Sequence, residues 1–569
     1  MSTNRIYLNG KPVDFTSNHY KGAGGEGTIY AKEGKAFKIY HDPDKCISEG
    51  KIRELGLLDA KNVLGPREPI HDKNGKPIGF WMPFVDKTEY LCKLFNKGFC
   101  ETNGIGPKEA AALVARMQQT LEWIHSKNIL VVDYNEMNFL TDRNFTEVFH
   151  IDVDCYQTPH YPATAIMASI RDPKVQKNQW STESDWFSFG ILACQLYIKA
   201  HPYKGRHPDH GKDWLAMMAA GVSIFNKATR MPPNTLDLSV IPKGHRKWLE
   251  RIMEHGERVK PPQPDQDITP VATQHPVIVN STETITIEEL FTADDTIQHA
   301  DLINGNVWVL TAGSLFKDGK VHTKLVKETG YQARRAKPGL CHIEGNAPAP
   351  AILKFNPILE VLSIKDTSFD LSENLPTEGF LTMFGKIYIT NEAGLVEISP
   401  MKMGAKPIAP KAIISQIFHN HVVLDGLVVQ DILGKCSITI PTSPGKARTH
   451  RIEQLDGHRI LSGKHESGFA IIVSEKAGVF QRTTILFDKT GSTFEILIED
   501  DADGEEPNFC VLDKGICVSA RGDELELFAN LTNKKVVKNS PVTASQKLRS
   551  WQNMVLVTHQ DKLLRLHLK

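Results

Sequence analysis

The sequence predicts an α+β domain followed by an all-β domain. Two stretches, residues 108–125 and 185–200, repeat their apolar side chains at the helical spacing of about 3.6 residues. A Pro-rich segment, residues 259–276, has little that could pack and is typical of an extended linker. After it the helical spacing gives way to short β-favouring runs with turn residues between them. We therefore expect domains at residues 1–258 and 277–569.

The composition is ordinary for a soluble globular protein. Of the 569 residues, 41% are apolar and 24% are charged, which suits large buried cores. Lys plus Arg and Asp plus Glu both number 67, so we expect no nucleic acid and no membrane as partner. The nine Cys form no C-x-x-C pair, which favours reduced thiols. With no signal-like start and no run of about 18 apolar residues, the sequence indicates a cytoplasmic protein.

The all-β half repeats at a regular interval. A spacing of roughly 40 residues matches one four-stranded blade of a β-propeller, so we expect a seven-bladed β-propeller. Six or eight blades, or two stacked sandwiches, remain open because no W-D or G-H signature marks the repeat. The candidate strand groups start near residues 297, 338, 376, 415, 457, 507 and 548.

A glycine-rich loop lies near the start of the chain, in YKGAGGEGTIY. Its glycines, Gly22, Gly24 and Gly27, would let the backbone approach phosphate groups that a Cβ would obstruct. A dinucleotide-binding fold carries the same spacing but continues as a helix, whereas here β-favouring residues follow. A second strand then carries Lys38. Strand, glycines, strand and lysine is the order found in protein kinases.

Lys38 is the expected ligand of the α- and β-phosphates of ATP, although a surface lysine on an edge strand would look the same. Its expected partner is a Glu of the next helix, for which the chain offers Glu49 and Glu54. We prefer Glu54, sixteen residues after Lys38, because its apolar neighbours would face the core. The segment GFWMPFVDK would then line the adenine site through Met82 and Phe84, unless it is a plain buried strand.

Three polar residues are expected to carry the chemistry. Asp133 takes the position of the catalytic base in VVDYNEMNFL, and Asn138 follows it by five residues. Asp152 comes fourteen residues later, after a strand-like run. An amide oxygen and a carboxylate beside a nucleotide suit Mg²⁺, which takes few protein ligands. Either Asp alone would more often be a turn residue, but both at this spacing, behind the glycines and Lys38, favour catalysis.

On these residues, the chain from about residue 20 to residue 258 resembles the Hanks-type Ser/Thr protein kinases, and more closely a divergent bacterial and phage branch. The resemblance implies an α+β bilobal protein-kinase fold that uses ATP and Mg²⁺. It also implies that Asp185 binds the catalytic-loop backbone. The matching segments are Asp133-Tyr-Asn135-Glu-Met-Asn138, Asp152-Val-Asp154, Tyr161-Pro162, Arg171-Asp172-Pro173, Ser184-Asp185 and His201-Pro202-Tyr203-x-Gly205.

The sequence also departs from the kinase pattern. Val131 and Val132 replace the His and Arg before the base, Asn135 replaces the usual lysine of the catalytic loop, and Asp154 replaces a glycine. Since every metal, phosphate and base group remains, we expect a Ser/Thr protein kinase whose propeller docks a protein substrate or partner. A regulating partner phosphatase fits this expectation. A pseudokinase scaffold and a kinase fold adapted to nucleotidyl transfer are the alternatives.

Overall fold

The computed structural model is mostly β, in many small antiparallel sheets. None of the helices in the described part of the chain is long and apolar enough to cross a membrane. The structure describes residues 4–163, 166–176, 179–232, 235–263, 285–326, 336–343, 349–365, 373–403, 406–418, 420–476, 478–500, 505–522, 524–538, 540, 542–544, 546–551 and 553–568.

The contacts divide the chain into two units. The first holds residues 1–101 and 105–274, and the second holds residues 102–104 and 275–569. The division falls inside the Pro-rich segment. Residues 264–276 of that segment lie outside the described residues, so their prediction as a linker stays a prediction.

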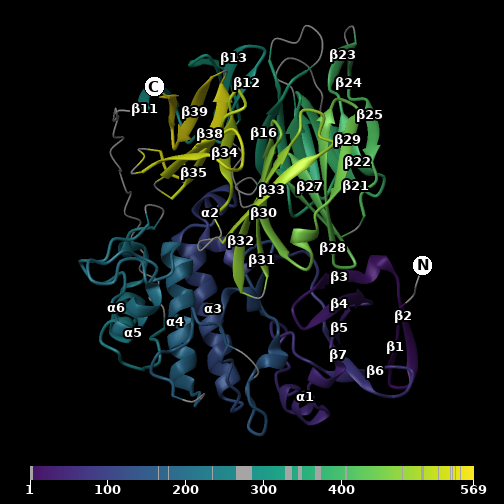
Figure 1. Ribbon diagram of the computed structural model, residues 1–569, viewed down its shortest axis with the longest axis vertical. Helices are drawn as coiled ribbons and strands as arrows, with labels where there is room; N and C mark the ends of the chain where they lie inside the picture. Colours follow the sequence, from purple (N-terminus) through teal and green to yellow (C-terminus); the bar gives the residue numbers. More distant parts are fainter. Residues whose placement is uncertain are drawn as a thin grey trace. The chain divides into compact units, whose positions relative to one another are not determined.

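The first unit contains a seven-stranded antiparallel sheet with the strand order β2-β1-β6-β7-β5-β4-β3 (Figure 1). One face buries an aromatic cluster around Tyr30 and Phe37, and the other face carries Lys38 and Tyr40 and packs on helix α1. The strands are β1 (Asn4–Leu8), β2 (Lys11–Phe15), β3 (Tyr20–Ala23), β4 (Gly27–Lys32), β5 (Lys35–Tyr40), β6 (Glu68–His71) and β7 (Pro77–Pro83), and α1 spans Glu49–Leu55.

The rest of the first unit is mainly helical. Its main core gathers apolar side chains of α3 and α4, the two helices that the sequence predicted. Its helices are α2 (Lys97–Thr102), α3 (Pro107–His125), α4 (Thr182–Ile198), α5 (Trp214–Ala220) and α6 (Lys243–Met253). A small sheet joins β8 (Thr88–Tyr90), β9 (Phe139–Asp142) and β10 (Val148–His150). Short 3-10 turns are η1 (Ser17–His19), η2 (Pro43–Lys45), η3 (Leu91–Phe95), η4 (Glu136–Asn138), η5 (Val153–Cys155) and η6 (Leu238–Val240).

The two long helices begin with capping contacts. At α3, Pro107 takes the first helical position, where its missing N–H costs nothing, and the Glu109 carboxylate accepts the Gly106 N–H at 2.9 Å. At α4, the Ser181 hydroxyl accepts the Ser184 N–H at 3.4 Å. The cap places Asp185 in the first turn of α4, where the next subsection finds it bound to the loop that carries Asp133.

The start of the predicted linker packs against the helices of the first unit, which corrects the expectation that little of it could pack. Trp248 Nε1 donates to the Val259 carbonyl at 2.8 Å, and His245 Nε2 lies 3.0 Å from the Pro262 carbonyl. Gln118 Nε2 donates to the same Pro262 carbonyl at 3.1 Å. Proline carbonyls accept as well as any other, so residues 259–263 supply acceptors for buried donors of α3 and α6.

A fragment of residues 1–263 should therefore be more stable than a fragment of residues 1–258. Without its last five residues, the nearly buried indole N–H of Trp248 and the side chain of His245 lose their acceptors, and each unsatisfied buried group costs roughly 1–3 kcal/mol. We expect the free energy of unfolding to differ by about 2–4 kcal/mol in urea titrations of the two fragments. Equal stabilities would contradict this packing.

The second unit contains seven four-stranded antiparallel sheets within its described residues. In chain order they are β12 (His299–Ile303) to β15 (Lys320–Lys324), β16 (Lys337–Cys341) to β19 (Glu373–Pro376), β20 (Phe380–Met383) to β22 (Gly394–Ile398) with β25 (Lys411–Ser415), β26 (His421–Leu424) to β29 (Lys446–Arg451), β30 (Arg459–Glu466) to β33 (Phe494–Asp500), β34 (Asn508–Val511) to β37 (Lys534–Val537), and β38 (Lys547–Trp551) to β40 (Lys562–Leu568) with β11 (Ile285–Thr292).

The middle strands of these sheets are β13 (Asn306–Leu310), β14 (Ser314–Lys317), β17 (Ala351–Asn356), β18 (Val361–Lys365), β21 (Lys386–Asn391), β27 (Leu427–Ile432), β28 (Lys435–Ser443), β31 (Phe469–Lys476), β32 (Val479–Phe487), β35 (Cys517–Arg521), β36 (Glu524–Phe528) and β39 (Met554–His559). A two-stranded sheet of β23 (Met401–Met403) and β24 (Lys406–Ile408) is inserted before β25, and the turn η8 (Glu453–Leu455) precedes β30.

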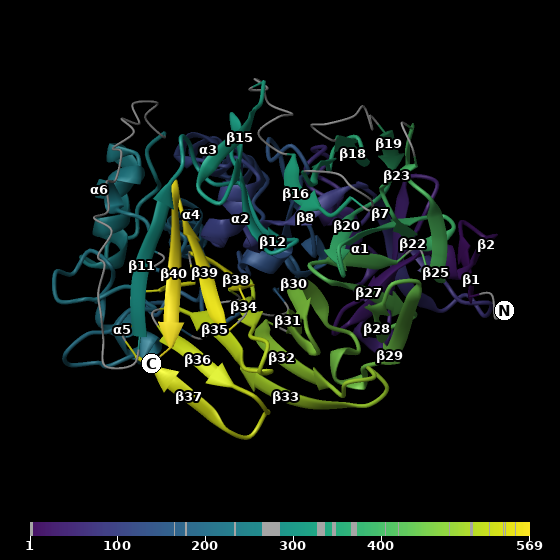
Figure 2. The same ribbon diagram turned by 90° about the horizontal axis from the view of Figure 1, so that it is seen from above.

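The seven sheets form a closed ring. Each sheet shares a buried apolar cluster with the next one along the chain, and the sheet of β34 shares one with the sheet of β38. A further cluster joins the sheet of β38 to that of β12. Figure 2 shows β11 beside β40, to which it is hydrogen-bonded from Ile285 to Thr292. Strands far apart in sequence therefore close the ring.

Candidate functional site

The glycine-rich segment forms a hairpin between β3 and β4. The Gly24 N–H donates to the Gly27 carbonyl at 2.9 Å, which closes the turn. A Cβ at Gly27 would lie 2.6 Å from the Ile39 carbonyl oxygen of the neighbouring strand, so only glycine fits there. Gly22 lies beside a bulge in the β3–β4 pairing. The hairpin thus brings Glu26 of its turn towards Lys38 on β5.

Lys38 is 5% exposed and lies among three carboxylates. Its Nζ is 2.7 Å from Asp154, 3.5 Å from Glu26 and 3.7 Å from Asp152. Desolvation by burial favours the neutral amine, but the charges of Asp154 and Asp152 outweigh it and raise the pKa of Lys38 well above its usual value. Lys38 is therefore a permanent cation that is held in place by acidic side chains.

Asp154 is the closest partner of this lysine. Its carboxylate is buried and also accepts the Tyr40 hydroxyl at 2.7 Å. The sequence analysis treated Asp154 only as a replacement for a glycine and assigned it no contact. Its position two residues after Asp152, in the pattern D-V-D, was the one available signal.

The expected pairing of Lys38 with Glu54 is wrong. Glu54 Oε1 instead lies 2.6 Å from His160 Nδ1, and the His160 N–H donates to its other oxygen at 3.3 Å. Glu49, the alternative, is exposed at the first position of α1. The inward face of this short helix carries Lys51, Ile52 and Leu55, so neither glutamate points to the lysine.

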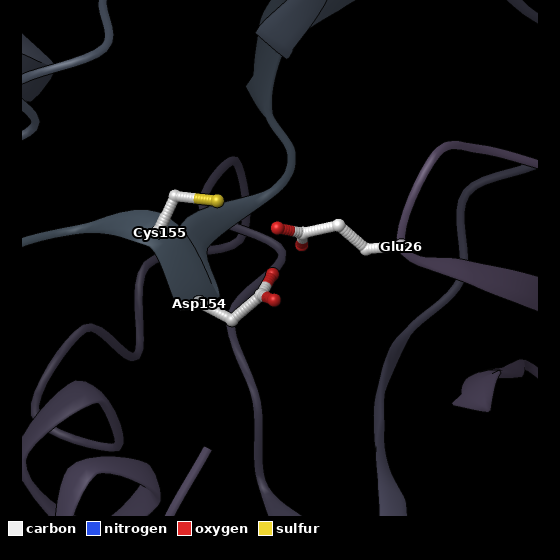
Figure 3. A group of neighbouring side chains, drawn as sticks. All are labelled: Glu26, Asp154 and Cys155. Atoms are coloured by element: carbon white, nitrogen blue, oxygen red, sulfur yellow. The ribbon is translucent and has the colours of Figure 1, made fainter. Parts of the chain in front are cut away.

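Figure 3 shows Glu26, Asp154 and Cys155 facing one another, with candidate ligand atoms within 4.8 Å of one another. Mg²⁺ prefers oxygen ligands and gains little from a thiol. Asp154 is already bound to Lys38 and Tyr40, and the ammonium group lies between it and Glu26. We therefore interpret this cluster as charge compensation for Lys38.

Asp185 holds the loop that carries Asp133. Its carboxylate is fully buried and accepts the N–H groups of Val131 at 2.8 Å and of Val132 at 2.9 Å. His125 Nε2 lies 2.9 Å from the same carboxylate. Val132 has a φ of 63°, a left-handed conformation that is rare for a β-branched residue. The buried carboxylate thus stabilises a strained turn directly before Asp133.

The Asp133 carboxylate is buried and accepts three hydrogen bonds from described residues. It accepts Asn135 Nδ2 at 2.7 Å, Asn138 Nδ2 at 3.2 Å and the Met167 N–H at 2.9 Å. Burial raises the pKa of Asp133 despite these three hydrogen bonds, which act in the opposite direction, and the charge of Asp152 adds to the increase. The Met167 N–H therefore contacts the carboxylate oxygen that Asn135 and Asn138 leave free. No sequence pattern pointed to this contact.

Asp152 and Asn138 lie beside each other in the chain's hydrogen-bond network. The Ile151 N–H donates to the Asn138 carbonyl at 2.9 Å, and Asp152 adopts a left-handed φ of 53° directly after it. The side chain of Asp152 is 29% exposed. The Asn138 amide oxygen accepts no hydrogen bond from a described residue. One carboxylate and one amide oxygen with access to water fit an oxygen-bound divalent cation.

The residues expected at the adenine site lie on β7 and directly after it, and β7 pairs with β5 and β6 inside the same sheet. Phe80 on β7 is the cross-strand partner of Lys38, and Met82 lies two residues further on the same face. Phe84 comes just after the strand, and its N–H donates to the Gly34 carbonyl at 3.1 Å. The structure therefore brings Met82 to the face that carries Lys38, with Phe84 at the strand end.

A segment after Asp152 packs across α1. A Cβ on Gly50 would lie 1.9 Å from the Tyr161 hydroxyl, and Lys51 Nζ donates to the Pro162 carbonyl at 3.1 Å. With the His160–Glu54 pair these contacts fasten residues 160–162 to the helix. The same segment continues to Met167, so its docking on α1 and its bond to Asp133 belong to one conformation.

A scan of the chain against models of protein families found no match. The candidate site is therefore described by its residues: a buried lysine beside a glycine hairpin, a buried aspartate in a constrained loop, and an Asn–Asp pair whose oxygens could hold a cation.

Replacing Glu54 with Gln should leave nucleotide affinity within about twofold of the unaltered protein, because Glu54 binds residues of the docked segment and not Lys38. Asp154→Asn should have a larger effect, because it leaves the Lys38 ammonium buried without its nearest anion, and losing one partner of a buried pair costs about 3–5 kcal/mol. Titration with a fluorescent ATP analogue, together with thermal unfolding, measures both. A larger loss in Glu54→Gln would restore Glu54 as the partner.

Proposed function

We propose that the protein is a Mg²⁺-ATP-dependent Ser/Thr protein kinase with a bilobal kinase fold, joined to a seven-bladed β-propeller that docks a protein substrate or partner. One observation carries the proposal. Asp133 is hydrogen-bonded to Asn138, which is backbone-bonded to the residue before Asp152, and Asp152 lies 3.7 Å from Lys38. Lys38 and Asp152, which are 114 positions apart in the sequence, thus lie close together, as the kinase resemblance implies.

Each residue has a distinct role in this proposal. Bound Mg²⁺-ATP supplies the phosphoryl group, with Asn138 and Asp152 as the residues that would hold the metal. Lys38 is a fixed cation for the phosphates, and the Gly22–Gly27 hairpin offers backbone groups without side-chain obstruction. Asp133 orients the substrate hydroxyl and accepts its proton. Its raised pKa makes it a better base than an exposed aspartate.

Asn135 binds Asp133 from the position where the kinase pattern has a lysine. Its Nδ2 donates to the Asp133 carboxylate at 2.7 Å, and its Oδ1 accepts the Met137 N–H at 2.8 Å. Both contacts orient the base without adding a charge. This arrangement supports a positioning role for Asn135, with Lys38 as the main cation near the phosphates.

The described conformation is closed to substrate, and this favours a second candidate function. The Met167 N–H donates to the Asp133 carboxylate, while Glu26 and Asp154 lie beside the Lys38 ammonium group that would bind phosphates. A pseudokinase scaffold would keep such contacts permanently. A kinase would exchange them for substrate and nucleotide, which requires residues 160–162 to leave α1 and Met167 to leave the Asp133 carboxylate.

The ring of the second unit supports the docking role. Seven four-stranded sheets closed by pairing the first strand with the last are the arrangement of a β-propeller. Closure leaves few free strand edges, so loops and inner strand ends remain to contact a partner.

Incubation with ATP labelled at the γ- or the α-phosphate tests the function. The purified protein, Mg²⁺ and a generic basic protein substrate should give covalent γ-label on Ser or Thr and no α-label. Lys38→Met should remove the γ-label. Covalent α-label would instead establish nucleotidyl transfer, the remaining alternative. If neither label becomes covalent although nucleotide binds, the scaffold is the correct function.

A further inference from the structure

A cavity of about 780 Å³ lies within the ring of the second unit. It is lined by the ends of inner strands from several sheets, among them β12, β16, β20, β30 and β38. A volume of this size is typical of sites for drug-sized ligands or short peptide segments. None of the residues of the proposed phosphoryl-transfer site is among the residues that line this cavity.

Two opposite charges in this cavity lack hydrogen-bond partners. Arg549 on β38 makes no side-chain hydrogen bond or ion pair with any residue that the structure describes. Asp425, just after β26, is exposed, and its carboxylate likewise accepts no hydrogen bond from a described residue. Burial favours the neutral form of Arg549, but the charges of Asp425, Asp301 and Glu466 raise its pKa, so its cation persists.

Most of the other charged lining residues already have partners; the exception is Lys489, which makes no hydrogen bond or ion pair with a described residue. Lys464 Nζ lies 2.9 Å from Glu466, and Glu466 also accepts the Val511 N–H at 3.0 Å and the Ser550 hydroxyl at 3.2 Å. Asp301 accepts the Leu302 N–H at 2.8 Å. Arg549, Asp425 and Lys489 are thus the charges that a ligand would meet.

An exposed aromatic residue also lines the cavity at an energetic cost to the fold. Phe384 is 50% exposed and has a φ of 52°, followed by Gly385 with a φ of 70°. This two-residue turn between β20 and β21 strongly prefers Asn or Asp before the glycine. The turn after β12 has the preferred Asn304-Gly305. A bulky side chain held in a left-handed conformation and exposed to water is a recognised mark of functional sites.

We propose that this cavity binds a segment of a partner polypeptide that carries one acidic and one basic side chain, with an apolar residue against Phe384. The acidic group pairs with Arg549 and the basic group with Asp425. The inference rests on the proposed docking role of the propeller and names the chemistry of its ligand. A free anion would pair only with the cations Arg549 and Lys489, and a free cation only with Asp425, whereas a mixed-charge peptide pairs with both kinds of charge.

Capped hexapeptide pools provide the probe. One pool places one Asp, one Lys and one Leu at every combination of positions in an Ala and Gly background. Two control pools replace Asp with Asn or Lys with Gln. Binding to the full chain is measured by fluorescence anisotropy without nucleotide. The mixed pool should bind at least tenfold more tightly than either control pool.

Two variants assign the charges. Arg549→Gln should remove the preference for Asp over Asn, and Asp425→Asn should remove the preference for Lys over Gln. Each should leave the other preference in place. Unchanged preferences in both variants, or equal binding of all three pools, would overturn the proposal.

The Phe384→Asn variant distinguishes a binding role of Phe384 from a purely structural one. Asn suits the left-handed turn, so the melting temperature should rise while affinity for the mixed pool falls at least fivefold. Leu433 offers a matched control: it is 53% exposed, has a φ of 55°, precedes Gly434, and is not among the residues lining the cavity. Leu433→Asn should raise the melting temperature with affinity unchanged.

The outcomes separate this inference from the proposed enzyme activity. Loss of affinity in both turn variants, or in neither, would overturn the role of Phe384. If γ-label is transferred but the mixed pool does not bind, the kinase proposal stands and the cavity proposal fails. If the pool binds selectively but no label is transferred, the cavity remains a peptide site on a protein of another function.

Discussion

Replacing Asp152 with Asn should lower the rate of phosphoryl transfer by about 10³-fold, because it removes the charged oxygen that would hold the metal beside the phosphates. The fold should persist: the side chain is partly exposed, and Asn is among the few residues that tolerate the left-handed φ of 53° found there. Single-turnover transfer of γ-label, with a melting curve of the same sample, measures both effects.

Asp209→Asn is the matched control, because Asp209 has a side chain that is 83% exposed and lies in a loop of the helical part. It should transfer label at the unaltered rate. An active Asp152→Asn variant would remove the metal assignment, and a variant that melts much earlier would show that Asp152 has a structural role instead.

A large loss of stability is expected for Asp185→Ala. Its buried carboxylate accepts two backbone N–H groups and contacts His125, so alanine would leave several buried polar groups unsatisfied. We expect the free energy of unfolding of the first unit to fall by about 3–5 kcal/mol. Urea titration followed by tryptophan fluorescence measures the change.

Glu183→Ala is the control for this experiment. Glu183 lies in the same first turn of α4 but is exposed, so its removal should cost at most about 1 kcal/mol through the helix dipole. Similar losses in the two variants would contradict the role of Asp185 in holding Val131 and Val132.

Local spacing was enough to predict the candidate site where its parts are close in sequence. The strand–glycine–strand order placed Lys38 on β5 beside the hairpin, since β3, β4 and β5 pair with their immediate neighbours. The six residues from Asp133 to Asn138 form one short turn, so the two side chains necessarily lie near each other. In the second half, the predicted strand groups begin within six residues of the innermost strands, the largest offset being 415 against His421.

Contacts that depend on the orientation of a helix could not be predicted in the same way. A small rotation of α1 about its axis decides whether Glu54 or Lys51 faces the sheet, and the nearby apolar residues Ile52 and Leu55 fit either orientation. The bond from Met167 to Asp133 is made by a backbone N–H, which every residue except proline has, so no side-chain pattern reveals it. The sequence also gave no sign that residues 285–292 would pair with β40.

That last pairing has a consequence for the protein during its synthesis. The partner of β11 emerges about 270 residues later, which at ribosomal speeds of about 5–20 residues per second takes roughly 14–54 seconds. Throughout this time β11 has no strand beside it, while each new sheet can pack only on the one made before it. The nascent chain therefore carries an unsatisfied β-edge, which is the kind of surface that chaperones bind and that neighbouring chains on a polysome can capture.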